Sequence, residues 1–330
     1  MPEHEGRASG KVILVGEHAV VYGVPAIAVG IERGARARAV FEGQTCELRL
    51  SVLNGEPVRA VVGEDDEPVA RAFAALLLSC GNKRPVRVEA HADLPAGAGL
   101  GCSAALGVAI ARAVVGVCTD DEARAHAMAW ERVFHGNPSG VDAAVATMGG
   151  AIVFERRDEA SPLESEKPAA IEPLEFGTQL VLAIGHSGVS SSTKTMVESV
   201  ARQRERSPDL VRKTFEGITA ISRNARLAIE AGDVVALGKL LDMNQMLLAG
   251  LLLSTQEIET LCMTARDAGA LGSKLTGAGG GGCVVALADS HESAEAIVSA
   301  WKREGFAGFV TEAGNREIRV KRARAVGGAA

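Results

Sequence analysis

Residues 95–105 read PAGAGLGCSAA, the more informative of two glycine-rich clusters in the chain. It follows a segment at 85–90 that alternates apolar and polar residues, and it leads into small apolar residues at 103–115, which predict a helix. Glycine lacks a Cβ, so backbone here can approach a ligand closely, and a helix start offers unpaired N–H groups and a positive dipole end. The pattern predicts a turn that binds phosphate; a glycine-rich turn without a ligand is the alternative.

Two other nucleotide-binding patterns can be compared with this stretch. The P-loop sequence G-x-x-x-x-G-K-[ST] is absent, since no lysine precedes Ser103. Residues 99–104 match the dinucleotide pattern G-x-G-x-x-A, but Asp120 and Asp121, near the offset of its ribose-binding acid, follow no second strand. A second glycine cluster, 277–282, matches G-x-G-x-x-G but is predicted between a helix and a strand, the reverse of the required order. The sequence therefore disfavours a dehydrogenase.

Strand and helix patterns mix in both halves of the chain, which predicts an α+β or α/β protein. Residues 155–173 combine charge and proline without periodicity and are the predicted linker, and Asp120 and Asp121 are predicted to cap a helix. Residues 326–330 are a predicted flexible tail. The predicted strands are 11–15, 25–31, 36–41, 46–52, 85–90, 151–154, 180–184, 283–288, 309–311 and 317–321, and the predicted helices are 67–80, 103–115, 120–134, 141–148, 191–205, 209–231, 233–253, 256–268 and 291–304.

The composition is that of a globular chain with a sizeable core. The 330 residues suffice for two domains of about 150 residues each. Hydrophobic residues make up 47%, which excludes a mainly disordered chain. The net charge of −6 leaves no basic excess, so we expect no dedicated nucleic-acid binding.

The cysteines and the N-terminus predict a cytoplasmic protein. None of the six cysteines forms a C-x-x-C pair or lies beside a histidine at zinc-ligand spacing, which indicates reduced thiols. The first ten residues are polar and lack the apolar region of a signal peptide. The longest strongly apolar stretch, 246–253, is far shorter than the roughly 20 residues that span a bilayer, so we expect no membrane partner.

Four segments resemble, in order, the motifs of the GHMP kinases, a superfamily of small-molecule kinases. The first is GKVILVGEHAVVYG at 10–23, and the second is LPAGAGLGCSAA at 94–105. ERVFHGNPSGVD at 131–142 is similar to the form that mevalonate kinases have, and KLTGAGGGGC at 274–283 resembles the last motif. Together the four motifs extend over most of the chain, which makes the resemblance highly specific.

The resemblance implies an α+β fold with two domains. An N-terminal domain like ribosomal protein S5 domain 2, with the ATP-phosphate loop, is expected at residues 1–160. A ferredoxin-like C-terminal domain is expected at 175–330, with the active site in the cleft between them. Family members are often dimers, so a homodimer is one expectation for this chain.

The implied activity is ATP-dependent phosphorylation of mevalonate to 5-phosphomevalonate in isoprenoid biosynthesis, with Mg²⁺ as the metal. Three alternatives stay open: a phosphomevalonate kinase, a sugar kinase, or a GHMP-like binding protein that has lost catalysis. The last is disfavoured because Lys11, Ser103, Glu131 and Asp142 are all present.

The motifs imply catalytic and metal roles for these four residues. Asp142 is expected to accept or orient the substrate's hydroxyl proton, and Lys11 beside it to stabilise the developing alkoxide and keep the aspartate ionised. Ser103 and Glu131 are expected to bind Mg²⁺, a hard cation that takes hydroxyl and carboxylate oxygens. Taken singly, Lys11 and Glu131 would be exposed charges, and Asp142 a helix-start acid that the dipole favours.

The remaining implied contacts concern ATP and the substrate. Glu17, His18 and Thr193 are expected to meet mevalonate. The family's usual Gly-Leu-Gly-Ser-Ser has Cys102 in place of its first serine here, either as an inert small residue or as a thiol of lowered pKa. The implied ATP-binding residues are Pro95, Gly97, Gly99, Leu100, Gly101, Cys102, Ser103 and Ala104.

Overall fold

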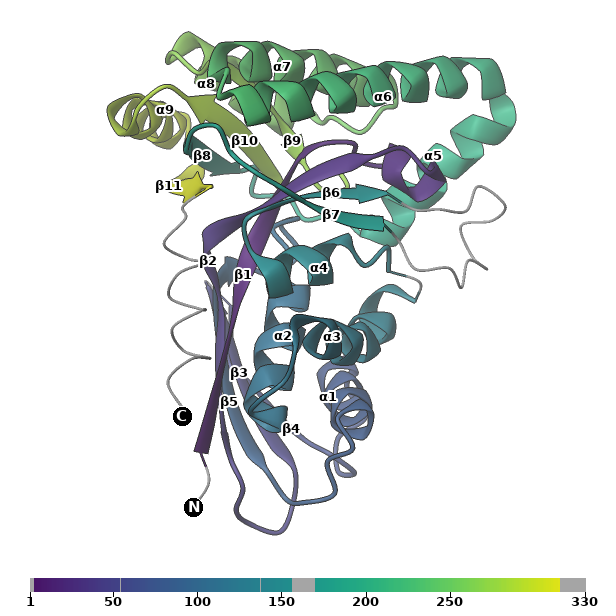
Figure 1. Ribbon diagram of the computed structural model, residues 1–330, viewed down its shortest axis with the longest axis vertical. Helices are drawn as coiled ribbons and strands as arrows, with labels where there is room; N and C mark the ends of the chain where they lie inside the picture. The colour runs from purple at the N-terminus through teal and green to yellow at the C-terminus, as the bar shows by residue number, and fades with distance from the viewer. Residues whose placement is uncertain (1–2, 54, 137, 156–169, 315–330) are drawn as a thin grey trace. The chain divides into compact units, whose positions relative to one another are not determined.

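The computed structural model describes residues 3–53, 55–136, 138–155 and 170–314, and Figure 1 shows its elements. Most of the predicted linker, the predicted strand at 317–321 and the predicted tail lie outside these residues. The chain forms two compact units. The first unit comprises Met1–Lys11, Glu32–Ala96 and Leu100–Gly149, and the second comprises Val12–Ile31, Gly97–Gly99 and Gly150–Ala330. The domain boundaries near residues 160 and 175 remain a prediction.

The first unit contains a sheet that has helices packed on one of its faces. Its strands are β1 (Glu3–Val15), β2 (Ala26–Val40), β3 (Glu47–Leu53), β4 (Val58–Val61) and β5 (Arg87–Pro95), the first two in part. The order is β4-β3-β5-β2, with β1 paired to β2; β3 and β5 are parallel, whereas β3 with β4 and β2 with β5 are antiparallel. In β5 the alternation of buried Val88, Ala90, Ala92 and Leu94 with exposed or half-buried residues turns one face toward the core.

Helices cover the buried face of this sheet (Figure 1). They are α1 (Pro68–Ser79), α2 (Cys102–Val115), α3 (Asp120–His135) and α4 (Val141–Met148). Helix α2 packs on β5, α3 and α4, and it is buried almost throughout because its side chains are small. The prediction that Asp120 or Asp121 caps α3 is wrong. Thr119 is the cap, in a reciprocal capping box with Glu122, and both aspartates lie in the first turn.

The second unit contains a four-stranded antiparallel sheet of ferredoxin-like topology. Its strands are β8 (Leu180–His186), β9 (Gly272–Thr276), β10 (Cys283–Ala288) and β11 (Ala307–Ala313), in the order β11-β8-β10-β9. Helices connect β8 to β9 and β10 to β11, which gives a βαββαβ sequence. The α+β class and the ferredoxin-like expectation are confirmed. Separately, β6 (Ala151–Glu155) pairs with β7 (Ala170–Leu174) and with residues 26–29 of β2.

Three short strands escaped the sequence prediction: β4, β7 and β9. Because β9 precedes it, the second glycine cluster lies between two antiparallel strands and not, as predicted, between a helix and a strand. No helix follows the cluster directly, so the argument against a dinucleotide-binding turn still holds.

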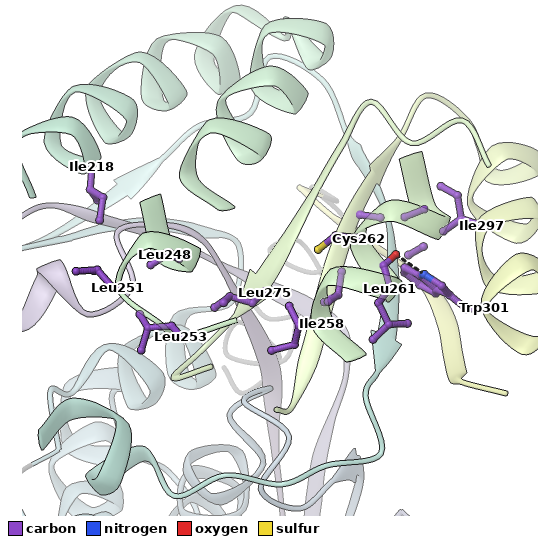
Figure 2. Packing of buried hydrophobic residues seen from close by; sticks show 14 of the residues in the cluster. Ile218, Leu248, Leu251, Leu253, Ile258, Leu261, Cys262, Leu275, Ile297 and Trp301 are labelled. Carbon is purple, nitrogen blue, oxygen red and sulfur yellow. Dashed lines mark hydrogen bonds between the residues drawn. The ribbon is translucent and has the colours of Figure 1, made fainter. Parts of the chain in front are cut away.

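Helices of the second unit enclose a continuous apolar core. Trp301 is fully buried in this core, and its indole N–H donates to the Leu261 carbonyl oxygen at 2.8 Å (Figure 2). Leu248, Ile258 and Leu275 pack in the same cluster. The helices are η1 (Ala19–Tyr22), α5 (Thr193–Arg206), α6 (Pro208–Ala231), α7 (Val234–Gly250), α8 (Gln256–Asp267) and α9 (His291–Arg303).

Within the described residues, no single helix is long and apolar enough to cross a membrane. Helices α2 and α3, bent by 120° to each other, pass that test only as a pair and only by length and composition.

Replacement of a core leucine on α8 tests the packing of the second unit. Leu261→Ala removes a fully buried side chain and should lower the free energy of unfolding by about 2–5 kcal/mol. The control is Met263→Ala on the same helix, whose side chain is 56% exposed and whose loss should cost under about 0.5 kcal/mol. Urea denaturation measures both; equal losses in the two variants would contradict this packing.

Candidate functional site

Lys11 is a buried cation held against the glycine-rich turn of the first unit. The residue is 2% exposed, and its backbone N–H donates to the Leu100 carbonyl oxygen at 2.9 Å. Gly101 has a left-handed φ of 72°, and a Cβ built there would lie 2.8 Å from Lys11 Cγ. Glycine is therefore required at position 101 both by its backbone angle and by the passage of the lysine side chain.

The partner of this cation is Asp142, in the first turn of α4. Lys11 Nζ lies 3.1 Å from Asp142 Oδ1, and the lysine side chain is 3% exposed whereas that of the aspartate is 36% exposed. A buried ammonium group requires a close counter-charge. The asymmetry in exposure leaves the carboxylate accessible to a small molecule while the lysine stays behind it.

Ser103 and Glu131 form a second pair in the same unit. Ser103, in the first turn of α2, donates its hydroxyl proton to Glu131 Oε1 at 2.5 Å, and Trp130 Nε1–H donates to Ser103 Oγ at 3.1 Å. His135 Nε2 lies 3.8 Å from Glu131 Oε2, one helical turn along α3. The carboxylate is therefore bounded by a hydroxyl on one oxygen and an imidazole near the other.

Burial dominates the electrostatics of this second pair. Glu131 is 4% exposed, and burial raises the pKa of its carboxyl to about 7, assisted by the negative charge of Asp142 and opposed by Ser103 and Lys11. Burial also lowers the pKa of His135, which favours the neutral imidazole. Because Asp142 and Lys11 both act on Glu131, the four predicted catalytic and metal residues form one electrostatic cluster.

The donor set of this cluster fits Mg²⁺. The described parts of the chain hold no group of three or more His, Cys, Asp or Glu side chains that would bind a metal unaided. One hydroxyl and one carboxylate are nevertheless what Mg²⁺ takes from proteins when phosphate oxygens and water complete its octahedron. A metal at Ser103 and Glu131 would also offset the cost of burying the Glu131 charge.

Of the two alternatives for Cys102, an inert small residue or a thiol of lowered pKa, the structure supports the inert residue. Its thiol is buried and donates to the Leu94 carbonyl oxygen at 3.7 Å, and burial raises its pKa to about 12. A thiol in this state is neutral at physiological pH and is a poor nucleophile.

Two glycine-rich segments pack against each other in the second unit. A Cβ at Gly99 would lie 2.8 Å from the Thr276 carbonyl oxygen, and one at Gly282 would lie 3.1 Å from the Ala98 carbonyl oxygen. Gly97 has a left-handed φ, and among the described residues a Cβ built there would meet only Ser190 Cβ, at 3.9 Å, so the backbone at this position is open. Close backbone packing therefore accounts for part of the glycine content, and the open position at Gly97 remains suited to a ligand.

The predicted substrate residues lie in different surroundings. Glu17 is fully buried, pairs with Lys274 Nζ and accepts from Asn244 Nδ2 at 3.1 Å; burial raises its pKa although Lys274 opposes the change. His18 Nε2–H donates to the Ala278 carbonyl oxygen at 2.7 Å, and burial lowers the pKa of this imidazole. Thr193 is exposed as the first residue of α5. Their contact with substrate remains a prediction.

The sequence analysis did not predict four residues that contact the expected site residues. Trp130 and His135 flank Glu131, whereas Lys274 and Asn244 surround Glu17. Lys274 heads the glycine-rich motif and Trp130 and His135 lie in or beside the Glu131 motif, so proximity in sequence was an available signal. Asn244 lies in mid-helix with no sequence signal.

A hollow of about 640 Å³ on the first unit's sheet contains none of these residues. It is lined by arginines of β1–β4, but Glu47 pairs with Arg49 and Arg59, and Glu3 pairs with Arg38. These ion pairs, two of them between strands and one within β3, indicate that the arginines form part of the charged outer face of a sheet.

Comparison with known proteins assigns the family. The model for the GHMP kinases N terminal domain matches residues 67–150, and that for the GHMP kinases C terminal domain matches 225–307. The mevalonate kinase of Aeropyrum pernix is 34% identical, with 94% of this chain and 96% of that protein covered. The chain belongs to the GHMP kinases. The mevalonate kinase of Thermococcus gammatolerans is 32% identical, with coverage of 95% and 97%.

The fold of this GHMP kinase has solved counterparts. The crystal structure of L. major mevalonate kinase in complex with R-mevalonate superposes with a TM-score of 0.80 at 28% identity, covering 95% of this chain and 96% of that one. The match extends over both family domains, as the order of the four motifs predicts.

The raised pKa of Glu131 predicts how stability of the metal-free kinase depends on pH. The folded protein keeps this proton up to about pH 7, whereas the unfolded chain releases it near pH 4.5. Stability contributed by the group is therefore full below pH 4.5 and is lost as pH rises to 7. Relative to Glu131→Gln, wild type should lose stability steadily as pH rises across this window, by about 3 kcal/mol in all.

Urea denaturation in EDTA at several pH values between 4.5 and 8 measures this difference. Glu295→Gln, at an exposed position on α9, is the control and should show no such trend. A difference between wild type and Glu131→Gln that does not vary with pH would contradict the buried, protonated carboxyl.

Proposed function

We propose that this chain is an ATP-dependent kinase that converts mevalonate to 5-phosphomevalonate and ADP. The observation that carries the proposal is the Lys11–Asp142 ion pair, which places a buried cation behind a partly exposed carboxylate, beside the first turn of a glycine-headed helix. The mevalonate kinases that match over 94–95% of the chain name the substrate for those relatives, and we extend it to this chain.

Asp142 and Lys11 have different proposed roles toward the substrate alcohol. The primary hydroxyl oxygen of mevalonate attacks the γ-phosphorus of ATP, and the bond from that phosphorus to the β,γ-bridging oxygen breaks. Asp142, an acceptor when ionised, orients the hydroxyl and takes its proton. Lys11, 3.1 Å from Asp142 Oδ1, offsets negative charge on the attacking oxygen.

Ser103 and Glu131 are the residues that would hold Mg²⁺. The metal, when bound, neutralises charge on the phosphate oxygens. Glu131 must lose its proton to serve as a ligand, and the positive charge of a metal favours that loss. Ser103 supplies a neutral oxygen, so the protein contributes one negative charge to the metal.

The glycine-rich turn and the start of α2 are the proposed phosphate-binding elements. Backbone N–H groups at the first turn of a helix have no partner within the helix and favour anions. The proposed ATP-binding residues Pro95, Gly97, Gly99, Leu100, Gly101, Cys102, Ser103 and Ala104 include the open backbone at Gly97 and this first turn. Cys102 takes part through its backbone, because its side chain is buried.

Glu17, His18 and Thr193 are the proposed substrate residues, with unequal support. The Glu17 carboxylate is already used by Lys274 and Asn244, so its effect on substrate would act through the position of the neighbouring His18. Thr193 has the exposure that a contact with a ligand requires. The cytoplasmic location and the homodimer stay predictions.

The activity is tested with a panel of alcohols. ADP release should give the highest kcat/KM with mevalonate among mevalonate, 5-phosphomevalonate, galactose and homoserine, because the segment that ends in Asp142 has the mevalonate-kinase form. A higher value for another member of the panel would assign a sister activity on the same fold, and no turnover of any of them would favour a binding protein.

The role of Asp142 predicts the effect of its neutral isostere. Asp142→Asn should lower kcat by about 10²–10⁴-fold, the usual contribution of a general base. ATP affinity, measured separately by calorimetry, should change little, because Asp142 is not among the proposed phosphate-binding groups. Asp267→Asn, at an exposed position ending α8, is the matched control. Near-normal kcat in a folded Asp142→Asn protein would remove this residue from the mechanism.

A further inference from the structure

Trp130 lies immediately before Glu131 and is almost completely buried, with 1% of its surface exposed. Its indole N–H donates to Ser103 Oγ at 3.1 Å, and Ser103 donates in turn to Glu131 Oε1. Trp130 and Glu131 are adjacent on α3, and Ser103 is hydrogen-bonded to both of them. The three residues form a short directed chain of hydrogen bonds.

The direction of this chain follows from the chemistry of its members. An indole nitrogen can only donate, whereas a hydroxyl has one proton and two lone pairs. Ser103 therefore accepts the Trp130 N–H with one lone pair and donates its own proton to Glu131. One lone pair of the hydroxyl remains.

Packing holds the indole in place. A Cβ at Gly107 of α2 would lie 3.0 Å from Trp130 Cδ1, so the glycine makes room for the ring. On its own helix, Phe134 lies with its ring centroid 5.3 Å from that of Trp130. A ring fixed on two sides gives its N–H a fixed direction.

We propose that Trp130 is a positioning residue, whose indole N–H orients the Ser103 hydroxyl so that its remaining lone pair is available to a divalent cation. The proposal rests on the proposed metal role of Ser103 and Glu131. In this proposal Trp130 is not a ligand of the metal and acts through its hydrogen bond to the serine.

The chain supplies its own control, since it has two tryptophans and both are buried donors. Trp130→Phe and Trp301→Phe each remove one buried indole N–H bond, but the acceptor of Trp301 is the Leu261 carbonyl oxygen in the second unit's core. Binding of Mn²⁺, used as the probe, to the full-length protein with saturating ADP is measured by electron paramagnetic resonance without turnover.

Trp130→Phe should weaken Mn²⁺ binding about 3- to 10-fold, as expected for loss of one hydrogen bond, and Trp301→Phe should leave it within about 2-fold. Equal Mn²⁺ affinity in wild type and a folded Trp130→Phe protein, or an equal loss in both variants, overturns the positioning role alone. No Mn²⁺ binding by wild type with ADP overturns the metal site and this inference with it.

A second measurement needs no variant at Trp130. The ¹H–¹⁵N spectrum has two indole signals, and Trp301→Phe identifies the one that belongs to Trp130. Addition of Mg²⁺ to the wild-type ADP complex should shift the Trp130 signal and leave that of Trp301 in place. An unmoved Trp130 signal contradicts the proposal.

Discussion

A buried ammonium group must have its counter-charge within contact distance, and Lys11 meets this condition through Asp142 at 3.1 Å. That requirement constrains the surroundings of both residues. Gly101 leaves space for the lysine side chain, the Leu100 carbonyl anchors its backbone, and Gly140 in a left-handed conformation starts the helix that carries Asp142. The arrangement places a cation against the aspartate and leaves its carboxylate partly exposed, where a small molecule can reach it.

In the second pair, Ser103 and Glu131, burial of the carboxyl is the dominant electrostatic effect. Burial raises the pKa of Glu131 to about 7, so its negative charge is unfavourable until a cation arrives. Burial and the negative charge of Asp142 favour the neutral carboxyl, whereas the hydrogen bond from Ser103 and the charge of Lys11 oppose it. The charges of Lys11 and Asp142 both act on Glu131, so the two pairs are electrostatically coupled.

The sequence predicted the helices that carry the site because their signals are local. Gly101 before small apolar residues, and Gly140 before residues 141–148, mark the starts of α2 and α4 within a residue or two. Strand β9 was missed because its five residues are all buried and owe their conformation to pairing with β10. The motif pointed to Lys11, Ser103, Glu131 and Asp142, but the burial of Glu17 against Lys274 and Asn244 joins positions more than 200 residues apart, which local pattern does not reveal.

We propose that Lys11 and Asp142 act as one unit in phosphoryl transfer. A double-mutant cycle on kcat with Lys11→Met, Asp142→Asn and the double variant measures the coupling between them, with ATP binding confirmed for each protein. If the two residues form one unit, the double variant should be no more than about 10-fold slower than the worse single variant. Multiplication of the two single losses in the double variant would show that the residues act independently and would contradict the account.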